Sequence, residues 1–594
     1  MRSFFKFFFA SLLALVVFSL IGFFIMMMVV AGLTSKEPEA VAAKSVLVLD
    51  LSLPYMEQEL QDPIAELSGE SDRLVPGLYD VVRLIDKAAK DSSIKALYIK
   101  AGNNPNGFAA SEEIRNAVIR FRSKRKPVIA YAEYISQKAY FVANAANKVY
   151  VHPKGGMEWM GLSAQIPFIK GTLDKLEIEP QIFYAGKFKS ATEPLREYKM
   201  TDANKLQTLE MLEDMYRRML VTTAEARQVD TATLRALTLN AAVKTAQDAV
   251  SQKLIDGLKY DDEVKAELRT HLKLAKDAAI SFVSMGSYSK AVNYKRTGSM
   301  SNRIAVIYAE GDILSGKGAE GQIGSDTYRN LIHKARTDKA VKAIVLRINS
   351  GGGSSIASET IWRELSLARK DKPVVVSFGD VAASGGYYMA CAGDSIFAQP
   401  NTITGSIGVF GMIFNLKQFM DQKLGVTFDG VKTAPLADMG NAFRPLNETE
   451  KAWIQQEIDQ IYLDFKTRVS DARKLSMEYV DSIAQGRVWT GERALKLGLI
   501  DKLGGLEDAI ACAARMAKVS DYRVREFPEP QSFLDKIFNT GKEAVRTNAL
   551  KEELGAEGFA LYQRARFIRQ HLNQAQTRMP FDILVHPGRF SVEQ

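Results

Sequence analysis

The chain has few of the residues that usually build disulfide frameworks, metal sites or histidine-based active sites. It contains two cysteines, Cys391 and Cys512, and five histidines among 594 residues. Two cysteines cannot form a disulfide framework or a metal site unaided, and the small apolar run around Cys391 is typical of a packing residue. The histidines are scattered, and none has a neighbouring carboxylate pattern that would indicate a catalytic triad. Nothing in the sequence therefore points to a metal, nucleotide or organic cofactor.

The sequence also lacks a domain-sized run of one charge. Its 78 basic and 69 acidic residues leave a formal net charge of +9. Nucleic-acid binding requires clustered lysine and arginine, so we expect no nucleic-acid partner. The hydrophobic content of 46% and the charged content of 25% are ordinary for globular proteins. A chain of this length is expected to form two or more domains.

One long stretch has no charge at all. The segment from Phe7 to Leu33 is almost wholly apolar, and its 27 residues would span about 40 Å as a helix. The A-x-A pattern in "AVAA" (residues 40–43) would suit a cleaved signal peptide, but the apolar core of a signal peptide is usually shorter, about 7–15 residues. We therefore expect a retained membrane anchor. Arg2 and Lys6 precede it, which predicts a cytoplasmic N-terminus with the remaining chain outside.

Two parts of the sequence repeat each other. "KALYIKAGNNPNGFAASEEI" from Lys95 matches "KAIVLRINSGGGSSIASETI" from Lys342, and "YFVANAANKVYVHP" from Tyr140 matches "YYMACAGDSIFAQP" from Tyr387. Both pairs are offset by 247 residues (342 − 95 and 387 − 140), while "KPVIAY" and "KPVVVSF" between them are offset by 246 (372 − 126). An offset held this closely indicates a duplicated domain.

Both copies alternate short β-branched runs with helical stretches. This pattern predicts βαβ units around a largely parallel sheet, and hence an α/β fold. The expected divisions are an anchor and short linker at 1–44, a first repeat at 45–282, a linker at 283–302, a second repeat at 303–525 and a helical tail at 526–594.

Three stretches of the second repeat have the composition that acyl transfer requires. In "RINSGGGSS" (residues 347–355) a buried strand ends in glycines, whose N–H groups could form an oxyanion hole or simply a tight turn. In "AASGGYY", Ser384 precedes Gly385 at a strand-to-helix corner, a common place for a nucleophile. "NTITGSIGVFG" (residues 401–411) could form an extended rim beside this site.

The first repeat lacks these features. Ser384 falls opposite Gln137 or Lys138, depending on where the one-residue slip lies, and Gly351–Gly353 fall opposite Asn104–Asn106. The first repeat therefore cannot carry the same reaction alone. A lysine could deprotonate Ser384 if burial lowered its pKa, but spacing alone does not choose one among the many lysines.

Several motifs together identify a known family. "RINSGGGS", "AASGGYY" and "TGSIGVFG", with "GKFKSATEPLREYKM" (residues 186–200), resemble the signal peptide peptidase A family, also called protease IV, in its long, duplicated, membrane-anchored form. The resemblance extends from Ser45 to about Val524. It implies tandem Clp peptidase/crotonase-like domains and a serine–lysine dyad.

The resemblance also implies roles for individual residues. Ser384 corresponds to the nucleophile, Lys189 to the general base, Ser406 to the serine that holds the lysine amine, and Gly352 or Gly353 with Gly385 to the oxyanion donors. The family usually has proline where this chain has Gly351; glycine can adopt the same dihedral angles, so we expect activity to survive. Lys187 and Lys432 are rival bases.

The function implied is that of a membrane-anchored serine endopeptidase that degrades released signal peptides and other apolar segments. The resemblance further implies a bacterial inner-membrane location, periplasmic catalytic domains and a homotetramer. A crotonase-like acyl-CoA enzyme and a non-catalytic scaffold derived from a protease are the alternatives. An exported location, where CoA is not expected, argues against the first, and the presence of both Ser384 and Lys189 argues against the second.

Overall fold

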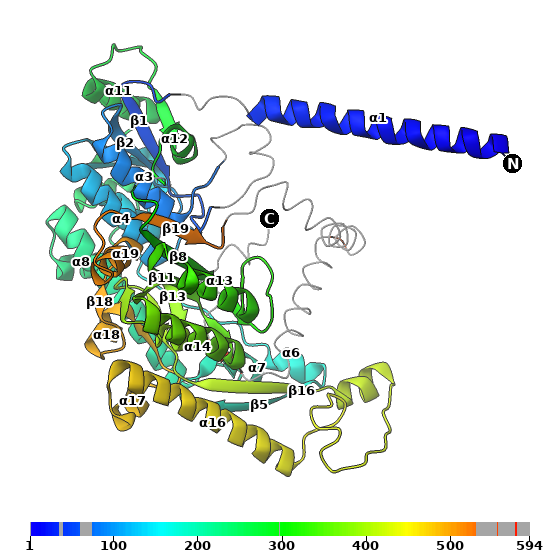
Figure 1. Ribbon diagram of the computed structural model, residues 1–594. Helices are drawn as coiled ribbons and strands as arrows, with labels where there is room; N and C mark the ends of the chain where they lie inside the picture. Colours follow the sequence, from blue (N-terminus) through cyan, green and yellow to red (C-terminus); the bar gives the residue numbers. More distant parts are fainter. Residues whose placement is uncertain are drawn as a thin grey trace.

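A computed structural model describes residues 2–34, 40–59, 74–295, 298–529, 555 and 576–578. Figure 1 shows two α/β units stacked one above the other, with one long helix extending away from them. The predicted tail from residue 526 lies outside the described residues except for its first four positions, Gly555 and the short segment 576–578.

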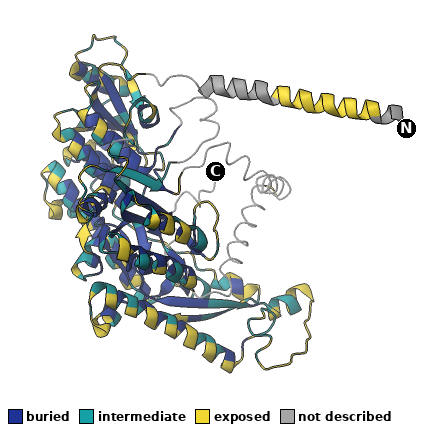
Figure 2. Ribbon diagram, in the orientation of Figure 1, coloured by how far each residue is buried: buried dark blue, intermediate teal, exposed yellow. Residues whose placement is uncertain are grey.

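The long helix is α1 (Arg2–Thr34). It includes the whole apolar run predicted as an anchor, and the side chains of Phe7 and Phe18 are 75% and 78% exposed (Figure 2). Among the helices in the described part of the chain, none has the length and apolarity needed to cross a membrane.

The first unit is built on a six-stranded parallel sheet in the order β6-β4-β3-β2-β1-β7. Its strands are β1 (Ser45–Asp50), β2 (Ile94–Lys100), β3 (Val128–Ile135), β4 (Lys148–Met157), β6 (Gly257–Leu258) and β7 (Phe282–Ser284). The strands β1 to β3 are largely buried, as their near-continuous apolar sequences predict.

The second unit repeats this arrangement. Its sheet has the path β18-β14-β13-β11-β8-β19, to which β15 and β17 are added beside β13. The strands are β8 (Arg303–Glu310), β11 (Val341–Ser350), β13 (Val374–Ala383), β14 (Ser395–Ala398), β15 (Ile403–Gly405), β17 (Val488–Thr490), β18 (Lys502–Leu503) and β19 (Arg523–Phe527). The identical strand order is the structural counterpart of the sequence repeat.

Helices surround both sheets. The first unit has α3 (Leu78–Lys90), α4 (Phe108–Ser123), α5 (Gln137–Ala143), α6 (Lys170–Lys175), α7 (Glu193–Arg196), α8 (Asp202–Arg227), α9 (Thr231–Leu239), α10 (Ala246–Ser251), α11 (Asp261–Leu272) and α12 (Met285–Ala291). The second has α13 (Ser325–Thr337), α14 (Ser355–Asp371), α15 (Gly385–Ala390), α16 (Glu448–Arg473), α17 (Met477–Ile483), α18 (Gly491–Lys496) and α19 (Leu506–Met516).

The two longest of these helices are duplicates. Each of α8 and α16 has 26 residues and begins at a side-chain cap, in which Thr201 or Asn447 accepts a hydrogen bond from the backbone three residues later. Each ends at a left-handed residue, Gln228 or Lys474. The two repeats therefore share the way in which their longest helix begins and ends.

A third sheet joins the two units. Its order is β10-β9-β12-β20-β16-β5. Five of its strands follow residue 302: β9 (Asp312–Leu314), β10 (Gln322–Gly324), β12 (Gly352–Ser354), β16 (Val409–Asn415) and β20 (Gln576–Arg578). The sixth, β5 (Glu179–Ala185), belongs to the first unit and pairs antiparallel with the full length of β16. This pairing brings residues just after β5 beside the second unit.

A buried ion-pair network also connects the units. Arg347 on β11 is fully buried and donates hydrogen bonds to two carboxylates of the first unit, Glu57 at 2.9 Å and Glu113 at 2.7 Å. Burial raises the pKa of the Glu57 carboxyl to about 7, against the opposing effect of Arg347. In Figure 2 the strands of both units are mostly dark blue, which marks buried residues.

The structure adds detail to the predicted divisions. The predicted linker at 283–302 begins with the end of β7 and with α12, so the first sheet continues past residue 282. In the second unit the equivalent strand is β19, which pairs with β8 and ends at Phe527. Both cysteines are buried and free, as expected of packing residues.

Candidate active site

Ser384 stands at the corner between β13 and α15. Its backbone has φ 54° and ψ −115°, an unusual conformation for a residue other than glycine. The conformation is held from both sides, because the Ser384 N–H donates to Gly405 O at 2.8 Å and Ser384 O accepts from Tyr388 N at 2.8 Å. A sharp strand-to-helix turn of this kind aims the serine hydroxyl away from the sheet that supports it.

Lys189 reaches this corner from the other unit. It lies four residues after β5 and immediately before the short 3₁₀ helix Ser190–Thr192. Its backbone N–H donates to Gly186 O at 3.0 Å, which fixes a tight turn at the end of the strand. Since β5 pairs with β16, this turn is placed beside residues of the second unit.

The lysine amine bridges two serines. Lys189 Nζ lies 2.8 Å from Ser384 Oγ, 3.1 Å from Ser406 Oγ and 3.2 Å from Ser406 O. Ser406 itself has a positive φ of 50°, so two of the three residues at this point have strained backbones. The structure thus brings together the three side chains that the sequence motifs had singled out from segments far apart in the chain.

The environment of the amine favours its neutral form. The side chains of Lys189, Ser384 and Ser406 are almost fully buried. Burial lowers the pKa of Lys189 well below its ordinary value, because a charged ammonium is costly to desolvate. A neutral amine at hydrogen-bond distance from a serine hydroxyl can accept its proton, which makes Ser384 a nucleophile.

The glycines expected to form the oxyanion hole lie in β12. A side chain at Gly353 would put its Cβ 2.1 Å from Ile313 O, so this strand can approach β9 only with glycine at that position. The Gly352 N–H donates to Ser350 Oγ at 3.1 Å, which commits that donor within the turn. Gly385 is the first residue of α15, where a helix has no internal acceptor for the N–H. The expected donors, Gly352 or Gly353 with Gly385, therefore lie in β12 and at the start of α15.

An extended segment lies directly against these glycines. The backbone of β20 pairs antiparallel with β12, with Gly353 opposite Thr577 and Gly352 opposite Arg578. On its other side β20 pairs with β16 at Phe410. The gap between β12 and β16 therefore accepts one strand of extended polypeptide beside Ser384.

The rival bases lie elsewhere. Lys432 is partly exposed and forms an ion pair with Asp438 at 3.0 Å. Lys187 is exposed, and its amine lies over the ring of Phe188. Neither contacts Ser384 among the interactions of the described residues.

The histidines of the described part of the chain also have other partners. His152 packs against Tyr260, His271 lies beside Glu267 and His333 beside Glu364. Histidine chemistry at Ser384 is therefore not supported by these three residues.

Residues 485–488 support the site, and the sequence did not indicate this. Residues 485–488 contact both the loop of Lys189 and Ser406: Gln485 O accepts from Phe188 N, and Arg487 O accepts from Ser406 N. Gly486 has φ 73°, and a Cβ there would lie 2.7 Å from the backbone N of Lys189. The dipeptide "QG" at 485–486 is a signal for a turn, but nothing in the sequence links that turn to residue 189.

Known proteins resemble this chain over most of its length. Residues 120–275 and 366–520 both match Peptidase family S49. The chain is 35% identical to Protease 4 of Salmonella typhi over 545 residues, which cover 89% of this chain and 86% of that protein. It is 32% identical to Protease 4 of Haemophilus influenzae, with 89% and 90% covered, and 33% identical to the chloroplastic serine protease SPPA of Arabidopsis thaliana, with 73% and 64% covered.

Solved structures give only a distant likeness. A ClpP1 mutant from Listeria monocytogenes is 16% identical, covers 34% of this chain and 94% of its own, and has a TM-score of 0.24, too low to carry an argument. The family assignment rests instead on the sequence matches, one in each repeat. On those matches the chain belongs to peptidase family S49, with its S49 region duplicated, and is a serine protease.

Proposed function

We propose that this serine protease is a membrane-anchored endopeptidase that hydrolyses apolar peptide segments, released signal peptides among them, with Ser384 as nucleophile and Lys189 as general base. The observation that carries the proposal is the 2.8 Å separation of Lys189 Nζ and Ser384 Oγ in a buried site. Each repeat supplies one member of the dyad, so one active site is expected per chain.

The reaction follows from this geometry. Neutral Lys189 takes the proton of Ser384 Oγ as the oxygen attacks the substrate carbonyl carbon, and the N–H groups of Gly352 or Gly353 and of Gly385 stabilise the oxyanion. The ammonium then gives its proton to the leaving amine, and an ester remains on Ser384. Lys189 next deprotonates a water that attacks the ester, and the proton returns to Ser384 as the acid product leaves. Ser406 holds the amine toward Ser384 throughout, through its hydroxyl and carbonyl oxygens.

The substrate binds as an extended strand. The pairing of β20 with both β12 and β16 supports this mode, because these two strands hold one extended segment of the chain, residues 576–578, between them, and the substrate takes the place of that segment. Main-chain recognition tolerates many sequences. A segment already unfolded, such as a released signal peptide, can enter this gap without first losing its own secondary structure.

The anchor and the assembly are further parts of the proposal. The uncharged run Phe7–Leu33 anchors the chain in the bacterial inner membrane, with Arg2 and Lys6 on the cytoplasmic side and both repeats in the periplasm. The chain acts as a homotetramer, as the family resemblance implies. A reporter enzyme that works only outside the cytoplasm should be active when it is fused after Gln594.

A kinetic comparison tests the dyad. Wild type, Ser384→Ala, Lys189→Ala and Lys432→Ala are assayed on a fluorogenic apolar peptide from neutral to alkaline pH. We expect both dyad variants to be inactive and Lys432→Ala to resemble wild type, whose rate should rise with pH as Lys189 loses its proton. Wild-type turnover by Ser384→Ala would refute the mechanism. Activity in Lys189→Ala with its loss in Lys432→Ala would refute only the assignment of the base.

A further inference from the structure

Gln207 on α8 is buried beside the lysine base without contacting the dyad. Its side chain is 1% exposed. Gln207 Nε2 donates to Phe188 O at 3.1 Å and to Ser190 Oγ at 2.8 Å, so it holds the residues on both sides of Lys189. Its Oε1 accepts from Val488 N at 3.3 Å. One side chain of the first unit therefore binds both the base loop and a strand of the second unit.

These bonds close a ring around the reacting amine. From Gln207 the ring passes to Val488, and Arg487 O then accepts from Ser406 N at 2.7 Å. Ser406 Oγ meets Lys189 Nζ, and the backbone of the lysine loop returns to Gln207. The distance between the base and the serine that orients it is thus fixed by a circuit in which Gln207 is the side-chain link.

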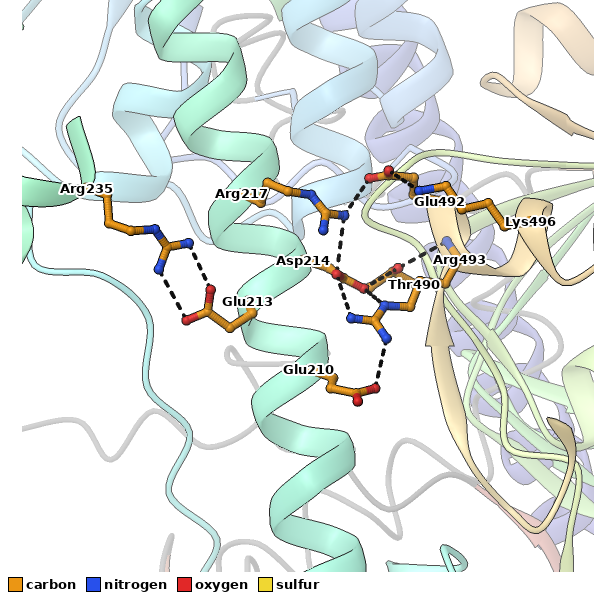
Figure 3. A network of polar contacts seen from close by, with 9 residues as sticks. All are labelled: Glu210, Glu213, Asp214, Arg217, Arg235, Thr490, Glu492, Arg493 and Lys496. Carbon is orange, nitrogen blue, oxygen red and sulfur yellow. Dashed lines mark hydrogen bonds and ion pairs between the residues drawn. The ribbon is translucent and has the colours of Figure 1, made fainter. Parts of the chain in front are cut away.

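The same face of α8 continues the attachment outward. Glu210 accepts from Arg487. It also accepts from Arg493, and Asp214 accepts from Thr490 and Arg493, as Figure 3 shows. Gln207, Glu210 and Asp214 are spaced by three and four positions, so they line one side of α8. They face β17 and α18 of the second unit. Glu213 lies off this side and pairs instead with Arg235 of α9.

The contacts of Gln207 differ in role from those of Glu210 and Asp214. The ion pairs of Glu210 and Asp214 hold the two units together. Among the interactions of the described residues, those of Asp214 do not involve the base loop, whereas Arg487, which Glu210 binds, lies over the ring of Phe188. Of the three α8 residues Gln207, Glu210 and Asp214, Gln207 is the one that binds the loop of Lys189 directly. Glu193, the carboxylate nearest along the base loop, is already bound by Thr201 and Asn204.

From this arrangement we infer that Gln207 is a positioning residue for the proposed dyad: it locks the loop of Lys189 to the Arg487–Val488 segment and so sets the register of the amine between Ser406 and Ser384. The inference rests on the proposed roles of Ser384 and Lys189. Reaction geometry is sensitive to displacements on the order of 1 Å, so loss of this link should slow the chemical step rather than substrate binding. A looser loop also admits water, which favours the charged amine.

Two substitutions of Gln207 separate these effects. Gln207→Met keeps the length of the side chain and removes all its polar contacts. Gln207→Glu keeps an acceptor for Val488 N but presents no N–H to Phe188 O. For both we expect kcat to fall about 10–100-fold, with KM changed less than about twofold. The ascending limb of kcat against pH should move to higher pH in both variants, because each favours the protonated lysine.

Matched variants on the same helix provide the controls. Asp214→Asn weakens the outer attachment of α8 and should lower the thermal midpoint while the pH limb stays where it is. Glu213→Gln, whose pair lies within the first unit, should change neither. The inference is overturned if Gln207→Met, folded by circular dichroism, has the rate and pH limb of wild type, or if Asp214→Asn moves the limb as far as Gln207→Met does. Activity in Ser384→Ala would instead overturn the proposed function itself.

Discussion

The two repeats share a strand order and differ at the corner where the nucleophile is proposed. In the second repeat β13 passes into α15 through Ser384, with φ 54° and no side-chain cap. In the first, β3 passes into α5 through Ser136, with φ −68°, and the Ser136 side chain caps Ala139 N. The first corner is an ordinary capped helix start. The second has a strained backbone, and the Ser384 hydroxyl does not cap its helix.

The glycine turn shows the same contrast. Where the second repeat has the glycine turn that includes Gly353, the first has Asn104 and Asn106, whose side chains bond to each other and to nearby backbone. The N-terminus of the following helix, α4, is occupied by Asp380 of the second repeat, which accepts from Ala109 N and Ala110 N. A scaffold can therefore lose a reaction while keeping its fold, once its strained and unsatisfied groups are satisfied internally.

Moving the serine is the strongest way to break this comparison. In a Ser384→Ala background, a second substitution Gln137→Ser or Lys138→Ser places a hydroxyl at the positions that the sequence repeat aligns with Ser384, just after the Ser136 cap. We expect the loss of at least about 10³-fold in kcat/KM to remain, because that corner has neither the strained backbone nor the glycine turn of the second repeat. Peptidase assays on both double variants make the measurement. Recovery of activity that is also lost in Lys189→Ala would show the repeats to be interchangeable.

The buried ion pairs between the repeats give the next largest effect. Arg347→Met leaves Glu57 and Glu113 buried without their cation, which should lower the free energy of unfolding by about 3–5 kcal/mol. Denaturation in urea, followed by fluorescence, measures the loss. The variant Arg347→Met/Glu57→Gln/Glu113→Gln should regain most of it. If the single variant is as stable as wild type, the network does not hold the repeats together.

A pH-dependent difference separates Lys189 from Lys138, which is only partly buried. The neutral form of Lys189 is favoured on folding, while the unfolded chain binds the proton up to about pH 10.5, its ordinary pKa. Stability of wild type relative to Lys189→Met should therefore rise as pH increases from the lowered pKa of Lys189 toward 10.5. Lys138 also has a pKa lowered by burial, but Asp380 opposes the shift, so Lys138→Met should show the weaker slope. Equal slopes, measured by thermal unfolding across this range, would contradict the distinction.

The smallest effect concerns how the two equivalent helices are capped. Asp380→Ala removes the cap that the second repeat gives to α4 of the first repeat. Ser354→Ala removes the cap that α14 receives from its own repeat. Each should cost about 1 kcal/mol of stability. Only Asp380→Ala should reduce the coupling between the repeats, seen as a wider separation of their unfolding transitions. The idea fails if both variants widen it equally.

Much of the fold follows from sequence periodicity. The 247-residue offset and the continuous apolar strands predict two parallel sheets, and both appear with one strand order. Two of the three residues of β7 lie in the predicted linker, which carries no strand pattern of its own; pairing with β1 makes them part of a strand. The parts that local patterns determine were predictable, and those that depend on a distant partner were not.

The candidate site divides in the same way. Ser384 has a local signal, since small residues and glycines surround it, whereas Lys189 was chosen only by family resemblance. Their contact depends on the pairing of β5 with β16, which no local pattern encodes. Gln207 had no signal at all, because a glutamine inside a long helix is ordinary. Its significance comes from the elements against which α8 packs.

The split of the dyad also has a consequence for the synthesis of the chain. Lys189 and Ser384 are 195 positions apart, which at 5–20 residues per second is about 10–40 s of translation. Residues 485–488, which fix the lysine loop, emerge later still. A growing chain therefore carries a base without a nucleophile, and then a nucleophile without a fixed base. In the proposed mechanism, peptidase activity therefore begins only after residues 485–488 have been synthesised and have folded against the lysine loop.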